Sequence, residues 1–490
     1  MTEIDAPARP TLTRAHIGLA AGPLLCALVL LLPPPDGMPP LAWRAAAVGA
    51  LMAVWWVTEA IPIAATALLP IVLFPVLGVS TVAAATAPYA NPAIYLFLGG
   101  FLIAMALEGC GLHRRMALAV LGVAGTRPAN LIFGFMGATA FISMWVSNSA
   151  TVVMMLPMAT SVMALARGGT QPSAGAAPRH FEVALLLGIA YAGNIGGLGT
   201  LIGTPPNALL AGFMSESYGV QIGFMQWMLL GVPIVALSLP VAWLLLTRWL
   251  YPVGSDPIAG GAAMLRAERL ALGSMSRAEW TVGAITAMTA VAWVSRPLIE
   301  GVFPALTDAG IAITGAVLLF VVPLTWRPLQ VALTWAQAER LPWSVLILFG
   351  GGLSLAAAIQ ETGLAAWIGG ALGALAGWPT FAVILVVTAV VIFLTELTSN
   401  TATAAAFLPV VASLAVGIGA DPLLLAVPTA LAASCAFMMP VATPPNAIVY
   451  GTGALTIPQM ARAGLWLNLF FIALLPLVVY LLAGRLFTSS

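Results

Sequence analysis

Lysine is absent from this chain of 490 residues, and all 17 of its basic residues are arginine. Charged residues make up only 7% of the sequence, whereas a soluble domain carries roughly 25%. Hydrophobic residues make up 61%, and the mean hydropathy is +1.05. So few charges cannot cover such an apolar chain in water. The composition therefore excludes an ordinary soluble protein and indicates that the solvent is lipid.

Other scarcities exclude further classes of protein. The three cysteines all lie in apolar stretches, so we expect buried packing residues rather than a disulfide framework. A net charge of +1 gives no reason to expect a nucleic-acid partner. His16, His113 and His180 are far apart and lack the spacing of metal ligands, so no cofactor is expected. No catalytic His, Cys or acid pair recurs at membrane depth, and we do not expect an enzyme.

Apolar runs long enough to cross a bilayer dominate the chain. A membrane helix needs about 20 mostly apolar residues. The runs are too long for barrel strands and do not alternate as such strands do. We therefore predict an all-α polytopic membrane protein with about eleven transmembrane helices. The clearest runs are 15–33, 41–58, 61–79, 222–247, 305–325 and 464–484.

The arginines predict how these spans are oriented, because cytoplasmic loops collect positive residues. With the N-terminus in the cytoplasm, fourteen arginines lie inside and three outside. This count holds only if segments 128–166 and 379–417 enter the membrane and return without crossing it. We thus predict two re-entrant helical hairpins in a protein of the cell's inner (plasma) membrane. The first fourteen residues are expected to be a short cytoplasmic tail rather than a cleaved signal.

Two stretches recur in the two halves of the chain at one offset. WVSNSATVVMMLP (145–157) and LTSNTATAAAFLP (397–409) align when shifted by 252 residues. FLGGFLIAMALEGCGL (97–112) matches FGGGLSLAAAIQETGL (349–364) at the same shift. Matches in the same order at one offset indicate an internal repeat.

A further pair of motifs supports the repeat, and the number of crossings between equivalent motifs predicts how the two halves are oriented. GTPPNALL (203–210) and ATPPNAIV (442–449) align at an offset of 239. Five predicted crossings separate equivalent points, and because five is odd the halves should face opposite ways. This inverted-topology repeat is typical of secondary transporters. The predicted segments are 1–40 for the tail and an extra first span, 41–250 for repeat 1, 251–277 for a cytoplasmic linker and 278–490 for repeat 2.

The repeated motifs predict irregular backbone at membrane depth. Two prolines in Thr-Pro-Pro-Asn lack donors, so spans 181–215 and 422–456 should break near the bilayer centre. Such backbone survives there only when it is buried or lines a wet cavity. The Ser-Asn pairs would stand at the hairpin tips, where they suit helix N-caps.

Tips and breaks of this kind can bind two kinds of ion. Free N–H groups at helix N-termini attract carboxylates, and unwound carbonyls, hydroxyls and amide oxygens bind an alkali cation. One half-site in each repeat predicts two cation sites with an anion between them. No arginine lies in the motifs and lysine is absent, so bound cations and helix dipoles must balance the anion. This favours cation-coupled uptake.

These residues resemble the divalent anion/sodium symporter family over almost the whole chain. The resemblance rests on SNSAT and SNTAT, both TPPNA motifs, FLTELTSNTAT (393–403) and WWVTEAIPIAATALLP (55–70). It implies a homodimer of elevator-type carriers for dicarboxylates, citrate or sulfate, mostly with sodium. Each protomer would have a scaffold domain and a transport domain that holds both hairpins.

The resemblance also implies site residues. The first sodium site would comprise Ser143, Ser147, Asn148 and the Gly203 carbonyl. The second would comprise Thr395, Thr398, Asn400 and the Ala442 carbonyl. The substrate would contact Asn148, Ser149, Thr204, Pro205, Asn400, Thr401, Thr443 and Pro444. Ser149 departs from the family's usual threonine, which keeps the hydroxyl but changes the shape of the pocket.

The function that we favour is sodium-coupled import of a C4-dicarboxylate such as succinate. Sulfate symport and dicarboxylate exchange by the same fold remain open, as do the identity of the dianion and coupling to sodium or to protons. An anion channel suits the repeated helix breaks less well.

Several residues outside the motifs also carry expectations. Glu396, just before the second triplet, is expected to be a structural acid that orients its hairpin, with proton coupling as the alternative. Glu59 and Glu108, near span ends, are expected to be packing or interface groups. The stretch 325–343 is apolar on one side and predicts an amphipathic helix along the inner surface.

Overall fold

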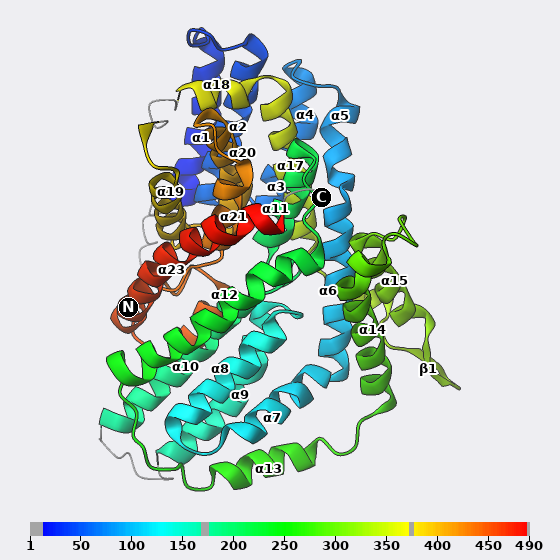
Figure 1. Cartoon of the computed structure of the whole chain (residues 1–490), viewed down its shortest axis with the longest axis vertical. Coiled ribbons are helices and arrows are strands. Elements are labelled where there is room, and N and C mark those ends of the chain that lie inside the picture. Colours follow the sequence, from blue (N-terminus) through cyan, green and yellow to red (C-terminus); the bar gives the residue numbers. More distant parts are fainter. Residues whose placement is uncertain (1–12, 168–175, 372–376, 488–490) are drawn as a thin grey trace, which may run out of the picture.

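A computed structural model describes residues 13–167, 176–371 and 377–487 of the chain, and it is almost entirely helical. The long helix α6 (Pro92–Cys110) runs down one side of the molecule and joins two groups of helices (Figure 1). The N-terminal group at one end comprises α1 (Arg14–Leu31), α2 (Pro40–Thr58), α3 (Ile63–Thr66), α4 (Leu69–Val76), α5 (Val82–Thr86) and the 3₁₀ helix η1 (Ala87–Ala90).

The first half of the chain then forms a hairpin and a broken helix. After α7 (Leu112–Ala124), helices α8 (Pro128–Ser143) and α9 (Asn148–Ala166) pack as a helix–turn–helix. A non-helical segment, residues 198–204, separates α10 (Ala176–Gly197) from α11 (Pro205–Tyr218), so the predicted break is confirmed. The last elements are α12 (Phe224–Leu244), the π-helical η2 (Leu245–Leu250) and α13 (Gly261–Ala271).

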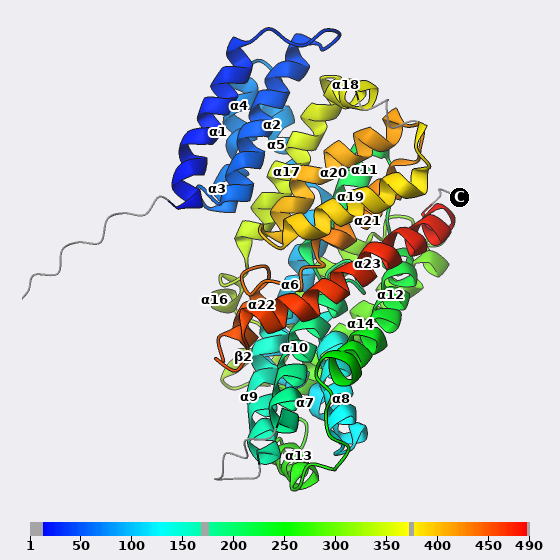
Figure 2. The ribbon, with the colours of Figure 1, turned by 90° about the vertical axis from the view of Figure 1, so that its left-hand side faces the viewer.

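The second half repeats this order. Helices α19 (Thr380–Thr395) and α20 (Asn400–Gly417) form the second helix–turn–helix, and residues 434–443 separate α21 (Pro422–Ala433) from α22 (Pro444–Tyr450). Helices α12 and α23 (Ile457–Leu486) follow the two breaks and lie side by side across the molecule (Figures 1 and 2). The second half begins with the elements that precede this hairpin, namely α14 (Arg277–Ile299), α15 (Asp308–Val321), β1 (Pro323–Trp326), β2 (Leu329–Val331), α16 (Trp335–Ala338), α17 (Trp343–Glu361) and α18 (Leu364–Ala371).

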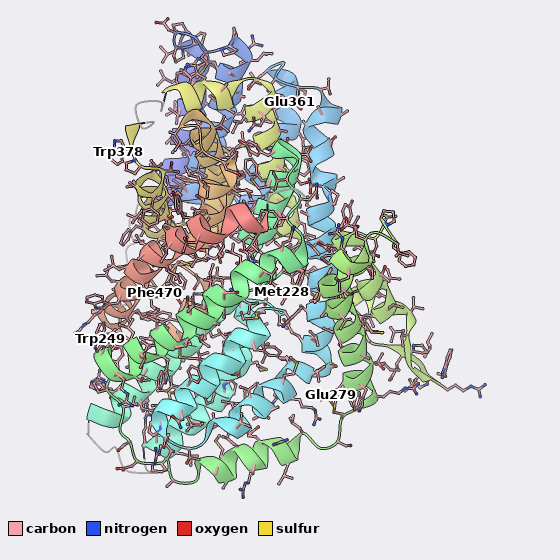
Figure 3. All side chains as sticks on the ribbon, in the orientation of Figure 1. Met228, Trp249, Glu279, Glu361, Trp378 and Phe470 are labelled. Atoms are coloured by element: carbon pink, nitrogen blue, oxygen red, sulfur yellow. The ribbon has the colours of Figure 1, made fainter. Side chains whose placement is uncertain are left out.

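The exterior of the bundle suits a bilayer. Nine helices in the described part of the chain are long and apolar enough to span a membrane. Large apolar side chains are exposed around the outside, among them Trp249 at 75% and Trp378 at 52% of their surface (Figure 3). Aromatic side chains of this kind are enriched where a membrane protein meets the lipid interface.

Close contact between helices depends on small residues at equivalent points of the two halves. A Cβ on Gly99 of α6 would lie 2.6 Å from the backbone carbon of Ala312, and one on Gly351 of α17 would lie 2.2 Å from the Ala67 carbonyl oxygen. Gly99 and Gly351 are 252 residues apart. Small residues allow membrane helices to approach at their backbones, since lipid offers no hydrophobic driving force. These two glycines thus let α6 pack tightly against α15 and let α17 pack tightly against the end of α3.

Two sequence expectations about local structure are wrong. The run 61–79 forms two short helices, because Pro70 at the start of α4 has no N–H to continue the helix from α3. The stretch 325–343 is not one amphipathic helix. Its first part belongs to the antiparallel pair β1–β2, in which Trp326 pairs with Leu329, and Trp335–Ala338 forms one short helix before α17 begins at Trp343. Pro328 interrupts any helix there for the same reason.

Candidate substrate and cation site

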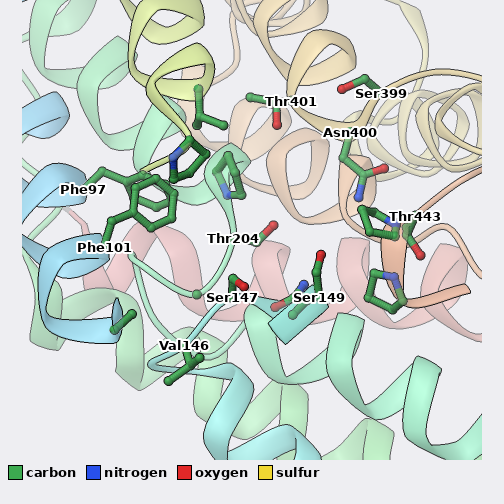
Figure 4. A pocket seen from close by; sticks show the side chains of 18 of the residues that line it. Phe97, Phe101, Val146, Ser147, Ser149, Thr204, Ser399, Asn400, Thr401 and Thr443 are labelled. Atoms are coloured by element: carbon green, nitrogen blue, oxygen red, sulfur yellow. The ribbon is translucent and has the colours of Figure 1, made fainter. Parts of the chain in front are cut away.

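A cavity of about 1000 Å³ lies between the two hairpin tips and α6. Ser149 of the first tip and Thr401 of the second face the same space, and Phe97 and Phe101 of α6 form an apolar wall beside them (Figure 4). The structure brings together all eight residues predicted to bind the substrate. These lining residues are Asn148, Ser149, Thr204, Pro205, Asn400, Thr401, Thr443 and Pro444.

The first tip is built by a serine cap and a buried cluster of oxygens. Ser147 ends the turn and accepts the Ala150 N–H at 3.2 Å, so α9 begins at Asn148. Behind the tip, the buried Ser143 Oγ lies 2.6 Å from Asn148 Oδ1 and 2.7 Å from the Gly193 carbonyl oxygen. Two acceptor oxygens therefore meet at one hydroxyl.

The second tip repeats this cluster. Thr395 Oγ1 lies 2.8 Å from Asn400 Oδ1 and 2.7 Å from the Ala433 carbonyl oxygen. Its hydroxyl has one proton and can satisfy only one of these acceptors. The cluster therefore has more acceptor oxygens than protons. Hydroxyl, amide and carbonyl oxygens of this kind bind hard cations in discontinuous membrane helices.

The other predicted sodium ligands differ in their surroundings. Ser147, Asn148, Gly203, Thr398, Asn400 and Ala442 line the cavity, whereas the side chains of Ser143 and Thr395 are fully buried behind it. Thr398 Oγ1 already lies 2.6 Å from Thr403 Oγ1 and 3.0 Å from the Leu394 carbonyl oxygen. The residue 252 positions before Thr398 is Val146, which has no side-chain oxygen. The two half-sites therefore match at the cluster but not at every ligand.

The asparagine of each Pro-Pro-Asn motif holds the break that precedes it. The buried Asn207 Nδ2 donates to the carbonyls of Gly197 and Thr200 at 3.1 and 2.8 Å. The buried Asn446 Nδ2 makes the same pair of bonds 239 residues later, at 3.2 and 3.0 Å. Unwound carbonyls at membrane depth need such partners. Our sequence reasoning gave these asparagines no role, although their recurrence within the motif was a usable signal.

Hydrogen bonds between the two breaks join the halves of the chain. Asn194 Nδ2 of α10 donates to Thr443 Oγ1 at 3.1 Å, and Thr204 Oγ1 lies 3.3 Å from Ser434 Oγ. The first of these bonds joins the end of α10 to the start of α22, and the second joins the end of α21 to the start of α11. The sequence offered no clear signal for Asn194 and Ser434, because they are 240 rather than 239 residues apart and differ in type.

Gly197 leaves room for the first oxygen cluster. A Cβ at this position would lie 3.0 Å from Asn148 Nδ2, from Asn148 Oδ1 and from the Gly203 carbonyl oxygen. Two predicted sodium ligands therefore border the space that the missing side chain leaves.

Both carboxylate oxygens of Glu396 accept hydrogen bonds from the protein. Its two carboxylate oxygens accept the backbone N–H groups of Phe437, Met438 and Met439 at 2.7 to 3.0 Å, and Oε1 also accepts Asn468 Nδ2 at 2.8 Å. The carboxylate fixes the second break, which supports the interpretation of Glu396 as an acid that orients this region.

Neither hairpin and neither helix break carries a basic residue of its own. Among the described residues that line the cavity, the only basic side chains are Arg14 and Arg340, which lie with Glu59 and Glu108 on segments outside both hairpins and both breaks. An anion between the tips would meet hydroxyls, amides and backbone N–H groups instead. Helices α9, α11 and α20 all begin at lining residues, so their positive dipole ends border the cavity.

Known proteins resemble this chain along nearly its full length. The family described as "Sodium:sulfate symporter transmembrane region" matches residues 14–488. The "Sodium-dependent dicarboxylate transporter SdcS" of Staphylococcus saprophyticus is 44% identical over 474 residues, which cover 95% of this chain and 91% of the relative. The protein of the same name from Staphylococcus aureus (strain MRSA252) is 42% identical over 481 residues, covering 96% and 92%.

Solved structures support the fold. The YdaH transporter of Alcanivorax borkumensis superimposes with a TM-score of 0.58 at 16% identity, over 96% of this chain and all of that one. MtrF of Neisseria gonorrhoeae, from "a Class of Antimetabolite Efflux Pumps", gives a TM-score of 0.55 at 12% identity, over 97% and 96%. At such identities the likeness concerns the fold alone.

Proposed function

The chain belongs to the divalent anion/sodium symporter family, and we propose that it is a sodium-coupled importer of a C4-dicarboxylate such as succinate. It is a multi-pass transporter of the plasma membrane and not an enzyme. The observation that carries the proposal is the pair of matching oxygen clusters behind the two tips, with the eight predicted substrate residues gathered between them.

Two sodium ions would occupy these clusters and the dianion would lie between them. Sodium at Ser143 and Asn148, and at Thr395 and Asn400, would draw together hydroxyl and amide oxygens that have too few protons to satisfy one another. The same two asparagines border the cavity, so cation binding and anion binding would share side chains. The remaining ligands would be those that the resemblance assigns.

The apolar wall favours a carbon skeleton over a small inorganic ion. Phe97 and Phe101 offer dispersion contacts to the methylene groups of a dicarboxylate, while its two carboxylates reach opposite tips. Sulfate has no apolar part to use this wall. Sulfate remains a candidate because the family description names it.

We further propose that both hairpins are re-entrant within an inverted repeat, and that they move together against a scaffold in a homodimer. The segments that line the rim include Arg14 and Arg340, which the charge bias assigns to the cytoplasm. In this arrangement the cavity opens inward, with the N-terminus in the cytoplasm.

Uptake of labelled succinate and sulfate into proteoliposomes, with and without an inward sodium gradient, tests the function. We expect saturable succinate uptake that requires sodium and is competed by other C4-dicarboxylates. Uptake that needs internal dicarboxylate but no sodium would identify an exchanger. Non-saturable flux without counterflow would identify a channel, and preferred uptake of sulfate would overturn the assignment of the substrate.

The re-entrant hairpin has its own test. Single cysteines at Arg127, just before α8, and at Ala166, the last residue of α9, should both react with an impermeant maleimide added from the cytoplasmic side. Reaction from opposite sides would show that the segment crosses the membrane and would contradict the proposed topology.

A further inference from the structure

Arg14, the first residue of α1, touches the second hairpin at the rim of the cavity. Its Nη1 donates to the Leu397 carbonyl at 3.1 Å, and its Nη2 lies 3.3 Å from Glu59 Oε2. Leu397 directly precedes Thr398, and Thr398 and Asn400 line the cavity. One guanidinium therefore joins α1, the end of α2 and the tip that carries predicted sodium and substrate ligands.

The backbone of Glu59 indicates that its side chain has a role. Glu59 ends α2 in the left-handed conformation, with φ 50° and ψ 42°, and it is the only non-glycine residue with positive φ in the described part of the chain. Glycine is usual at such helix ends because a Cβ is disfavoured there. A glutamate that adopts this conformation and pairs with Arg14 suits a contact that requires the carboxylate.

Arg14 is held in place by close contact between α1 and α2. A Cβ on Gly18 would lie 1.9 Å from Thr58 Oγ1, so the backbone of α1 packs directly against the Thr58 side chain of α2. Trp55 Nε1 also donates to the Gly18 carbonyl at 3.0 Å. The helix that carries Arg14 is thus fixed to the helix that carries Glu59, and the guanidinium stands at a defined point of the rim.

We propose that Arg14, oriented by Glu59, is a positioning residue that holds the second hairpin tip at this rim while the cavity is open on this side. The contact forms only where the Leu397 carbonyl reaches α1, so the tip must release Arg14 to move away. Removal of the guanidinium disfavours the arrangement with the open cavity. This inference rests on the proposed movement of the hairpins against the N-terminal helices.

Accessibility of the cavity measures this arrangement without requiring transport. Val441 lines the cavity and is 74% exposed, so Val441→Cys reports on the opening when an impermeant maleimide is added from the side of Arg14. The unmodified protein gives the background from its own three cysteines. The variants to combine with Val441→Cys are Arg14→Ala, Arg14→Lys and Glu59→Gln.

Arg44 offers a matched control. Its Nη1 donates to the Leu77 carbonyl at 2.8 Å, which is the same kind of bond but lies wholly within the N-terminal helices. Arg44→Ala removes an arginine and a carbonyl contact without touching the hairpin. Size-exclusion profiles and thermal unfolding of each variant show whether it has folded.

The expected result is slower labelling of Val441→Cys in Arg14→Ala, by about two- to tenfold, because a charge-assisted hydrogen bond shifts a two-state equilibrium by roughly an order of magnitude. Glu59→Gln should lower the labelling rate less. The labelling rate of Arg14→Lys should lie between those of Arg14→Ala and the wild type, because an ammonium lacks the planar fork that bridges two acceptors. Arg44→Ala should label at the wild-type rate.

Unchanged labelling in a folded Arg14→Ala protein would overturn the inference, as would an equal decrease in Arg44→Ala. Succinate uptake by the wild type is measured in parallel, and it tests only the proposed function. If the wild type takes up no dicarboxylate while labelling still depends on Arg14, the transport assignment fails and the positioning role stands.

Discussion

The space beside Gly197 provides a direct test of the first cation site. The change is Gly197→Ala, which adds one methyl group. The new Cβ would lie 3.0 Å from both side-chain atoms of Asn148 and from the Gly203 carbonyl oxygen, closer than carbon atoms normally approach polar atoms. The neighbours must move apart by a few tenths of an ångström, and these neighbours are the atoms expected to bind sodium.

The size of the effect follows from overpacking. One extra methyl group in a tightly packed interior costs about 1–3 kcal/mol. If this cost falls on the cation-bound state, half-maximal uptake should need roughly five- to hundredfold more sodium, since about 1.4 kcal/mol corresponds to tenfold. The backbone itself should tolerate alanine, because Ala436 occupies the equivalent point of the second break and its carbonyl also accepts a motif asparagine.

The assay is uptake of labelled succinate into proteoliposomes across a sodium series. Gly137→Ala on α8 is the matched control, because a Cβ there meets nothing within 4 Å. The control should leave the sodium curve unchanged, since it only replaces a helix glycine by a better helix former. Superimposable sodium curves for Gly197→Ala and the wild type would show that sodium does not bind beside Asn148.

Four further predictions concern the tips. Asn400→Asp should nearly abolish uptake at neutral pH, because a new charge about 5 Å from a carboxylate costs roughly 3 kcal/mol at an effective dielectric of 20. Uptake should partly recover at lower pH, where the new acid is neutralised. Uptake at the wild-type rate at pH 7 would show that the anion binds elsewhere. Ser143→Ala and Thr395→Ala should each raise the sodium concentration for half-maximal uptake, and unchanged curves would remove both from the ligand set. Thr401→Ser copies Ser149 of the first tip and should remain active in the same assay, whereas inactivity would indicate that the methyl group shapes the pocket. Glu396→Gln should lower the melting temperature, because an amide cannot accept all of the backbone N–H groups that the carboxylate accepts; an unchanged value would contradict its structural role.

The sequence predicted those parts of the site that depend on local chemistry. Prolines lack donors and must interrupt a helix wherever it lies. The breaks before Pro205 and Pro444 were therefore predictable from the motif alone, and so were helix starts at Asn148 and Asn400. The internal repeat added the expectation that these four points lie together, and all of them line one cavity.

The parts that the sequence missed depend on contacts between distant segments. The bond between Asn194 and Thr443 needs the two breaks to lie back to back, which no local pattern specifies. The bonds that Glu396 receives need three consecutive backbone N–H groups from the break between α21 and α22. The strand pair in 323–331 was not predicted, because the apolar residues on one side of 325–343 favoured a helix, although Pro328 cannot continue one.

The lack of basic residues in the hairpins and breaks has a physical consequence at the site. A dianion between the tips would be surrounded by groups without net charge, because the lining arginines of the described chain lie on segments outside the hairpins and breaks. Neutral hydroxyls and helix ends offset part of the cost of removing two charges from water, but each helix end contributes only about 0.3–1 kcal/mol. Two sodium ions would cancel the charge of the substrate. A fixed arginine in the same place would hold the dianion whether or not sodium was bound. In a binding site without net charge, binding of the anion depends on binding of the cations, and this dependence couples the transport of the two.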